Sequence, residues 1–324
     1  MIDFKSIQSL VASDMQKADQ VILEQLNSPV ALINQIGSYI IHNGGKRLRP
    51  LLTLITARAL GAPMEQSVVA ASFIELIHTA TLLHDDVVDM SEQRRGQASA
   101  NIAFGNASSV LVGDFIYTRA FQMMTSTGSL QILKLMSDAV NVISEGEVQQ
   151  LMNCHDPDTT EASYMQVIYS KTARLFEVAT QVPGVLAGVS ATQEEQLKSY
   201  GMHLGTAFQL IDDVLDYTAD NETLGKNIGD DLSEGKPTLP LIHAIQVAAP
   251  EQKAILRQAI ESPSESDEIG QIIDILHQTQ SLDYAVSVAR KEAELAINAL
   301  DFMHDSDYKK ALVDLAHLSV KRSA

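Results

Sequence analysis

The chain has 324 residues, of which 45% are hydrophobic and 20% charged, and its 41 Asp and Glu against 23 Lys and Arg give a formal net charge of −18. This apolar content excludes an intrinsically disordered chain, and the negative charge disfavours binding to bare nucleic acid or to anionic membrane surfaces. The single cysteine, Cys154, excludes an intramolecular disulfide and fits a reducing compartment, so we expect a cytoplasmic protein.

The N-terminal segment MIDFKSIQSLVASDMQKADQ carries early acidic residues and lacks the basic, apolar and cleavage-site order of a signal peptide. Uninterrupted apolar runs stay shorter than the roughly 18 to 20 residues of a membrane-spanning helix. We therefore expect no integral membrane segment and no nucleic-acid partner.

Apolar residues recur at helical spacing along almost the whole chain, and alternating strand patterns are nearly absent. Within residues 64–90, for example, Phe73, Ile77 and Ala80 follow three-and-four spacing, and Pro63 directly precedes the segment, as it often does at helix starts. In chain order the pattern predicts helices over 5–26, 30–42, 48–60, 64–90, 107–124, 129–152, 161–181, 191–218 and 238–247, followed by shorter ones.

Clusters of Gly, Pro, Asn, Asp and Ser interrupt these helices. They predict breaks at 43–45, 61–63, 155–158, 221–236 and 262–266. None of these breaks resembles a flexible linker between domains. The sequence therefore predicts an all-α fold, with many helices around one core in a single domain of residues 1–324.

Asp85, Asp86 and Asp89 form a first acidic cluster late in the predicted helix 64–90. Positions i and i+4 share a helix face, so Asp85 and Asp89 point the same way, with Asp86 beside them. Like charges repel there, and the helix dipole also disfavours anions at this end. The cluster is either a solvated acidic helix end or a site for a hard divalent cation such as Mg²⁺, which bridges carboxylates to substrate phosphates.

Asp212, Asp213 and Asp216 form a second acidic cluster with the same spacing. The segment 82–89 reads LLHDDVVD and the segment 209–216 reads QLIDDVLD. Acidic residues embedded among apolar neighbours are poorly explained by solvation alone. The repetition therefore favours cation binding over the solvated alternative for both clusters.

A basic segment, Gly44–Pro50, reads GGKRLRP and presents Lys46, Arg47 and Arg49 at a predicted helix start. Backbone donors and several cations at such a place suit an anion such as a diphosphate, although a basic loop is often only solvated.

More cations are scattered along the chain. Arg94 and Arg95 follow the first acidic cluster closely and resemble half of a phosphate clamp, although an exposed arginine pair is common. Lysines with weaker individual signals, each typical of a surface residue when taken alone, are Lys171 (followed by Thr172), Lys226 and Lys236.

Two histidines leave a choice of chemistry. His84 directly precedes Asp85, and a His-Asp pair is typical of one class of metal-dependent phosphohydrolase. The second acidic cluster contains no histidine, which favours an all-oxygen Mg²⁺ site and a structural or supporting role for His84. His78 lies about two turns before the acidic residues and could reach an anion.

These motifs together resemble a known family. GGKRLRP, HDDVVD followed by RR, KT, FQLIDDVLD, GK and GKPT occur in the order and spacing of the trans-isoprenyl diphosphate synthases, from about residue 40 to residue 240. The long-chain bacterial members, whose products become quinone side chains, are the most similar. The resemblance implies an all-α, usually homodimeric enzyme with a deep central cavity and three Mg²⁺ ions, which condenses isopentenyl diphosphate with an allylic diphosphate.

The resemblance also implies a role for each motif residue. Asp85 and Asp89 would bind two Mg²⁺ ions and Asp212 the third, supported by Asp86, Asp213 and Asp216. Isopentenyl diphosphate would bind to Lys46, Arg49, His78 and Arg95. The allylic diphosphate would bind to Arg94, Lys171, Thr172, Gln209, Lys226 and Lys236. Whether the tail residues Lys321 and Arg322 close over a substrate stays open.

Product length is expected to depend on residues just before the first acidic cluster. In the family, bulky aromatic residues at the positions of Ala80 and Thr81 give short products, so these small side chains imply a tail that passes further, along Ile77 and, on a facing helix, Met123. The alternative is that Ala80 is small only to allow close helix packing.

Four other functions compete with a long-chain synthase. A terpene cyclase would normally alter the second acidic cluster and lack the basic segment, and a catalytically silent subunit would lose charges from one cluster. Neither change is present. A phosphohydrolase would require His84, and a synthase of shorter products remains the fourth alternative.

Overall fold

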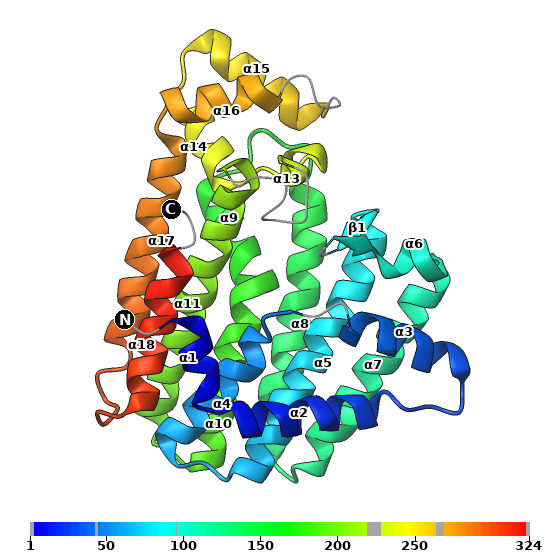
Figure 1. The fold of residues 1–324 in the computed structure, drawn as a ribbon. Helices are drawn as coiled ribbons and strands as arrows, with labels where there is room; N and C mark the ends of the chain where they lie inside the picture. The colour runs from blue at the N-terminus through cyan, green and yellow to red at the C-terminus, as the bar shows by residue number, and fades with distance from the viewer. Residues whose placement is uncertain (1–2, 43–44, 95, 219–227, 264–268, 322–324) are drawn as a thin grey trace. The chain divides into compact units, whose positions relative to one another are not determined.

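The computed structural model describes residues 3–42, 45–94, 96–218, 228–263 and 269–321 (Figure 1). The described residues are helical except for loops and one short antiparallel hairpin, in which Gln93–Arg94 (β1) pairs with Gln97–Ala98 (β2). The predicted all-α fold class is confirmed.

The contacts divide the chain into two compact units. Unit 1 comprises Met1–Val140, Leu175–Gly201 and Ala299–Leu315, and unit 2 comprises Asn141–Arg174, Met202–Asn298 and Ala316–Ala324. The single domain and the central cavity expected from the sequence stay predictions.

Helices that lie within unit 1 are α1 (Phe4–Ser9), α2 (Ala12–Gln25), α3 (Ala31–His42), α4 (Leu48–Leu60), α5 (Met64–Val88), α6 (Ala100–Phe104) and α7 (Asn106–Ser126). Those within unit 2 are α9 (Glu161–Ile168), the π-helix η1 (Tyr169–Ala173), α13 (Asp230–Ser233), α14 (Leu239–Val247), α15 (Pro250–Glu261), α16 (Ile269–Gln278) and α17 (Ser281–Asn298). Helices with residues in both units are α8 (Leu130–Asn153), α10 (Arg174–Ala187), α11 (Ala191–Thr218) and α18 (Asp307–Lys321).

Helix α5 is the central element of unit 1 and packs against α2, α4, α6 and α7 (Figure 1). The boundary before it follows from local chemistry. Gly61 has a φ of +68°, and the N–H of Ala62 bonds to the carbonyl of Ala57, so α4 ends in a glycine cap. Pro63 then precedes the first turn of α5, as predicted.

Helix α5 is also long and apolar enough to cross a membrane, by length and composition alone. However, 72% of its most apolar window is buried against the rest of the protein. Such burial is typical of the core helix of a globular unit.

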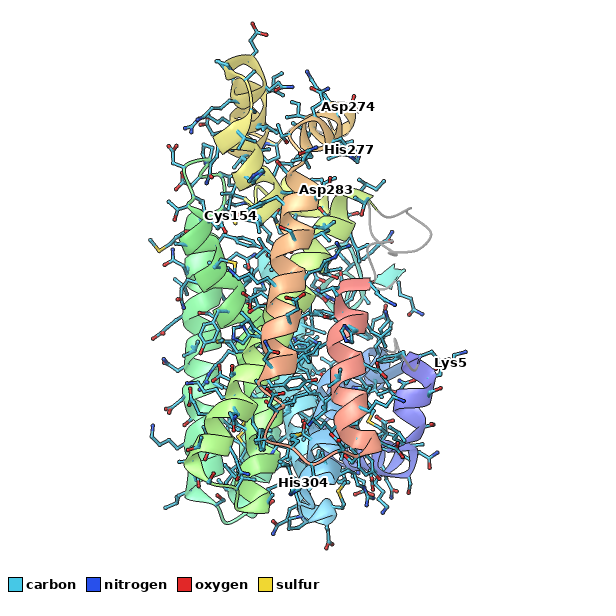
Figure 2. All side chains as sticks on the ribbon, turned by 90° about the vertical axis from the view of Figure 1, so that its left-hand side faces the viewer. Lys5, Cys154, Asp274, His277, Asp283 and His304 are labelled. Carbon is cyan, nitrogen blue, oxygen red and sulfur yellow. The ribbon has the colours of Figure 1, made fainter. Side chains whose placement is uncertain are left out.

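The core of unit 2 is built by α9, α11 and the helices from α14 to α17. Leu210, Ile211 and Val214, which flank the second acidic cluster on α11, are buried in this core. Helix α16 is amphipathic. It buries Ile272 and Leu276, while its polar residues face solvent (Figure 2).

Five local details differ from the sequence prediction. The helix predicted over 5–26 is two helices, separated at Leu10 and Val11. The helix predicted over 161–181 contains η1 and continues past Pro183 to Ala187. Helix α13 lies inside the predicted break 221–236, and neither α6 nor the hairpin was predicted. Parts of the predicted breaks at 43–45, 221–236 and 262–266 fall outside the described residues.

Candidate functional site

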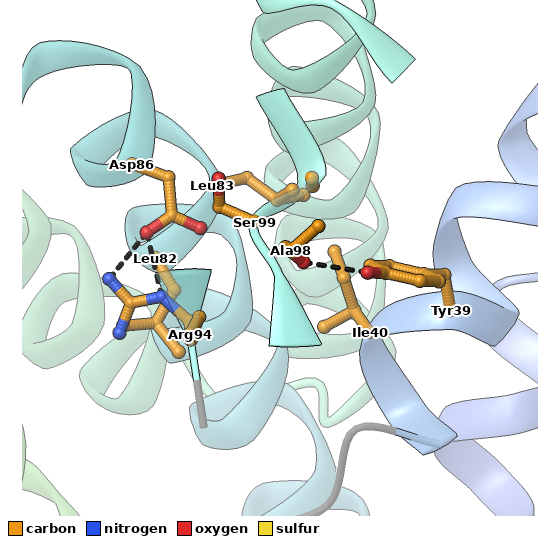
Figure 3. Close-up of a pocket in the computed structure, with 9 residues that line it drawn as sticks. Tyr39, Ile40, Leu82, Leu83, Asp86, Arg94, Ala98 and Ser99 are labelled. Atoms are coloured by element: carbon orange, nitrogen blue, oxygen red, sulfur yellow. Dashed lines mark hydrogen bonds and ion pairs between the residues drawn. The ribbon is translucent and has the colours of Figure 1, made fainter. Parts of the chain in front are cut away.

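The first acidic cluster occupies the C-terminal end of α5. Asp86 is buried, with 3% exposure, whereas Asp85 and Asp89 are partly buried. Arg94 on β1 binds one carboxylate oxygen of Asp86 through both Nε, at 2.7 Å, and Nη2, at 2.5 Å (Figure 3). Asp86 therefore anchors the hairpin to the helix end and leaves Asp85 and Asp89 as the better placed ligands for a cation.

Side chains from α6 and α7 bind the last carbonyls of α5. Ser109 Oγ donates to the Leu83 carbonyl at 2.8 Å, and Asn101 Nδ2 donates to the Asp86 carbonyl at 3.0 Å. The C-terminal end of a helix carries partial negative charge, and the Asp86 carbonyl there also accepts the Ser91 N–H at 3.0 Å. The two side-chain donors add to the backbone hydrogen bonds and fix the position of the helix end that carries three aspartates.

A small cavity of about 30 Å³ lies beside the Asp86–Arg94 ion pair (Figure 3). On its other side the Tyr39 hydroxyl donates to the Ala98 carbonyl at 2.6 Å. This volume is about that of one water molecule and is too small for a diphosphate. The cavity belongs to the support of the hairpin.

His84 points to α7. Its Nε2 lies 3.1 Å from the Val110 carbonyl and 3.4 Å from Asp114 Oδ1. A Cβ on Gly113 would lie 2.3 Å from this nitrogen, so the missing side chain makes room for the ring. This placement favours the structural role of His84 over a metal-ligand role.

The acidic residues fit a Mg²⁺ site by the chemistry of their donors. Asp85 and Asp89 offer carboxylate oxygens four residues apart at a helix end whose carbonyl dipoles also attract cations. Among the described residues, no three His, Cys, Asp or Glu side chains could hold a metal ion by themselves. Mg²⁺ suits such a partial site, because it commonly takes its other ligands from water and substrate phosphates.

The basic segment presents its cations differently. Lys46 is exposed, whereas Arg49 is partly buried, with its guanidinium 4.7 Å above the Phe176 ring. Desolvation lowers the pKa of Arg49 to about 10, and the negative charge of Glu75 opposes this shift. The Nε of Arg49 is buried without a hydrogen-bond partner among the described residues. His78 lies on α5 and is partly buried, whereas Arg95 lies outside the described residues.

The second acidic cluster is organised by a chain of hydrogen bonds within unit 2. Tyr164 donates to Asp213 Oδ2 at 2.5 Å, and Gln209 Nε2 donates to Oδ1 at 2.7 Å. Thr172 in turn donates to Gln209 Oε1 at 2.9 Å. Both oxygens of Asp213 are thus engaged by protein donors, and three residues predicted separately, Thr172, Gln209 and Asp213, are brought together.

Burial dominates the electrostatics of this chain of hydrogen bonds. Desolvation, followed by repulsion from Asp231, raises the pKa of Asp213 well above its usual value. Desolvation and the neighbouring Asp213 likewise raise the pKa of Tyr164. Asp212 is partly buried, and Asp216 accepts the backbone N–H of Asp231 at 3.3 Å.

The predicted Lys-Thr pair lies in η1, a π-helical turn of the kind often found at functional sites. Lys171 Nζ binds Glu147 Oε2 at 2.7 Å. A Cβ on the adjacent Gly146 would lie 2.5 Å from Ser170 Cβ, so glycine permits the close approach of α8 and η1. Elsewhere Lys236 pairs with Glu234, and Lys226 lies outside the described residues.

The expected chain-length residues lie in the interior of unit 1. Ala80 and Ile77 are fully buried on α5, and Thr81 donates to the His78 carbonyl at 2.8 Å. Met123 is buried on α7, which packs along α5. The role of these residues in product length stays a prediction.

Sequence analysis missed several supporting residues, among them Tyr164, Glu147 and Glu75. Tyr164 and Glu147 lie far along the chain from their partners, and no pattern marks them. Glu75 did carry a signal, because a charged residue stands there among the apolar positions of helix 64–88.

Replacing Tyr164 by Phe should destabilise the protein by about 1–3 kcal/mol, because the buried Asp213 carboxylate loses a donor. Tyr200→Phe is a matched control, since the Tyr200 hydroxyl is equally buried but donates to a neutral carbonyl, that of Leu312. Urea unfolding measures both changes in free energy. A Tyr164→Phe variant as stable as wild type would contradict the role given to this hydrogen bond.

Known proteins resemble this chain over nearly its whole length. A family model described as polyprenyl synthetase matches residues 30–303. The octaprenyl diphosphate synthase of Haemophilus influenzae is 56% identical over 323 residues, which cover 100% of this chain and 98% of that protein. The octaprenyl diphosphate synthase of Escherichia coli is 57% identical over 321 residues, with 99% of each chain covered.

Solved structures give the same result. The crystal structure of a polyprenyl synthase from Caulobacter crescentus, complexed with calcium and isoprenyl diphosphate, has a TM-score of 0.95 at 42% identity. The match covers 99% of this chain and 98% of that one. This protein belongs to the polyprenyl synthetase family.

Proposed function

We propose that this protein is a long-chain trans-polyprenyl diphosphate synthase, with octaprenyl diphosphate as its product. It condenses isopentenyl diphosphate head to tail, one unit at a time, onto an allylic diphosphate such as farnesyl diphosphate. This assignment rests on the 56% and 57% sequence identity, over nearly the full length, to two octaprenyl diphosphate synthases. The complete acidic and basic motifs disfavour a silent subunit and a terpene cyclase, and the packing of His84 disfavours a phosphohydrolase.

Asp85 and Asp89 of the first acidic cluster and Asp212 of the second are the residues that would hold Mg²⁺. The bound ions would neutralise negative charge on the diphosphate of the allylic substrate as it leaves. The number of ions, three by resemblance, is part of the proposal.

Cationic side chains share this task. Arg94, Lys171 and Lys236 would bind the allylic diphosphate, and each is oriented by a neighbouring acidic side chain. Lys46, Arg49 and His78 would bind isopentenyl diphosphate and hold its double bond at the allylic carbon, which lowers the entropic barrier to condensation. The proton released after bond formation passes to the expelled diphosphate.

Arg49→Ala should raise the KM for isopentenyl diphosphate by about tenfold to a hundredfold, because hydrogen bonds to a charged group are lost. The KM for farnesyl diphosphate should change little. Arg119→Ala is the matched control, since Arg119 stacks on Phe115 at 4.9 Å but lies outside the basic segment. A larger effect of Arg49→Ala on farnesyl diphosphate would reverse the assignment.

Three further features are proposals on the same basis. The product supplies the side chain of a quinone, and the enzyme works in the cytoplasm. A homodimer is supported by family resemblance and by exposed apolar side chains in unit 1 such as Ile102 and Leu111. A mass in solution near that of the single 35.2 kDa chain would contradict the dimer.

Diphosphate release tests the reaction class. The protein should release diphosphate when farnesyl diphosphate, isopentenyl diphosphate and Mg²⁺ are all present, and release should stop when EDTA removes the metal. Equal release without isopentenyl diphosphate would indicate a cyclase or a hydrolase instead.

A further inference from the structure

Glu75 is a buried acidic residue that the proposed reaction does not use. It lies on α5 with 6% exposure, between the fully buried Ile74 and Leu76. A carboxylate in such surroundings is strongly destabilising unless it is paired. Its partner is Arg47 of the basic segment, whose Nη1 donates to Glu75 Oε1 at 2.8 Å.

Arg47 needs this partner for its own conformation. Its backbone is left-handed, with φ 49° and ψ 41°, and it immediately precedes the first residue of α4. Residues other than glycine seldom adopt this conformation, and the surrounding structure has to hold them there. The ion pair with Glu75 does so, because the Arg47 side chain is 16% exposed and its second acidic neighbour, Asp19, is 3.8 Å away and half exposed.

The ion pair is next to all three described residues expected to bind isopentenyl diphosphate. Arg47 stands directly after Lys46 and two residues before Arg49. The charge of Glu75 also acts on the Arg49 guanidinium, which stacks on Phe176. His78 follows Glu75 by three residues on α5 and so lies on the same side of that helix.

We propose that Glu75 is a positioning residue for isopentenyl diphosphate, which fixes the basic segment through Arg47 without touching the substrate. The buried carboxylate holds the left-handed turn, and the turn sets where Lys46 and Arg49 present their charges. This inference rests on the proposed function, since it assumes that these residues bind isopentenyl diphosphate.

Unit 1 contains a second ion pair with a buried carboxylate, and this pair serves as a control. Asp14 on α2 is 3% exposed and accepts two hydrogen bonds from Arg58 on α4, at 2.9 and 2.7 Å. No residue expected to bind substrate adjoins this pair in the sequence. Neutralising Asp14 therefore reports what the loss of a buried ion pair does to stability alone.

The experiment compares Glu75→Gln with Asp14→Asn in the full-length enzyme. Isopentenyl diphosphate is titrated into each protein by calorimetry without allylic substrate, and KM is measured for both substrates. Glu75→Gln should weaken isopentenyl diphosphate binding and raise its KM by about tenfold or more, because small misplacements of binding groups are costly. Its KM for farnesyl diphosphate should stay near the wild-type value. Asp14→Asn should lower the Tm and leave both substrates' KM values unchanged.

The outcomes of this experiment either support or overturn the positioning role of Glu75. Equal changes in the two KM values, or a fall in Tm alone, would overturn the positioning role of Glu75. If Glu75→Gln does not fold, Arg47→Lys takes its place, since lysine keeps the charge but not the fork of donors. This variant should also raise the KM for isopentenyl diphosphate, and an unchanged KM would overturn the inference. Failure of the wild-type enzyme to bind isopentenyl diphosphate would overturn the proposed function itself, and this inference with it.

Discussion

Replacing Asp85 or Asp212 by alanine is expected to lower turnover by about a hundredfold to a thousandfold or more, while the helical circular dichroism stays unchanged. Both residues are partly buried, and each has a neighbouring aspartate that is fixed by protein donors. Alanine therefore removes a cation ligand without removing the hydrogen bonds of Asp86 or Asp213. Initial rates over a range of Mg²⁺ concentrations measure the effect.

Asp138→Ala is the control for this loss of charge. Asp138 lies on α8 and pairs with Lys134 on the exposed surface, where an ion pair contributes little. The turnover of the Asp138→Ala enzyme should match that of the wild type. Near-normal turnover in Asp85→Ala or Asp212→Ala would contradict the assignment of that cluster to metal binding.

Ala80→Tyr is expected to stop chain growth several units early, while condensation itself continues. Ala80 is fully buried on α5, one turn before His84, and the next turn towards the N-terminus carries the buried Ile77. A tyrosine at this level would occupy the path of the growing tail if that path runs along α5. Chromatography of the dephosphorylated products measures their length.

The alternative role of Ala80, close helix packing, predicts a different result. Overpacking the core at this position would lower stability by about 1–3 kcal/mol, with no specific shift in product length. Thermal unfolding of Ala80→Tyr and Ala80→Ser separates the two roles, since serine adds little volume. A stable Ala80→Tyr enzyme with unchanged long products would contradict both.

The helices could be predicted where local chemistry marks their ends. Gly61 and Pro63 mark the end of α4 and the start of α5, and both boundaries were predicted correctly. The end of α5 was placed two residues late. Met90 has a φ of +51° there, and Ser91 bonds back to the Asp86 carbonyl, in a cap where glycine is usual. The sequence contains no glycine to indicate this turn.

Other structural elements have no pattern in the sequence that would predict them. The strands of the hairpin have two residues each, too few to show alternation. The π-helical turn at Tyr169–Ala173 depends on the close approach that Gly146 allows, a contact between segments more than twenty residues apart in sequence. The predicted helix 161–181 ends two residues before Pro183, but α10 continues through this proline to Ala187, and the neighbouring Val182 is buried.

For the candidate site, the sequence identified the charged groups but not what holds them. The repeated acidic spacing marked Asp85 and Asp212, because like charges on one helix face repel each other and a bound cation relieves that repulsion. The pairing of Arg94 with Asp86 and the chain of hydrogen bonds from Tyr164 to Asp213 depend on tertiary contacts. Glu75 is a charged residue among apolar positions in the sequence, but only the structure shows that it is buried and pairs with the basic segment.

The chain length of the product distinguishes a long-chain synthase from the alternative functions. The purified protein is incubated with farnesyl diphosphate, excess isopentenyl diphosphate and Mg²⁺, and the products are dephosphorylated and compared with all-trans prenol standards by chromatography and mass spectrometry. All-trans octaprenol should be the main product. Products that end at farnesol or geranylgeraniol, a cyclic hydrocarbon, or no new carbon–carbon bond would contradict it.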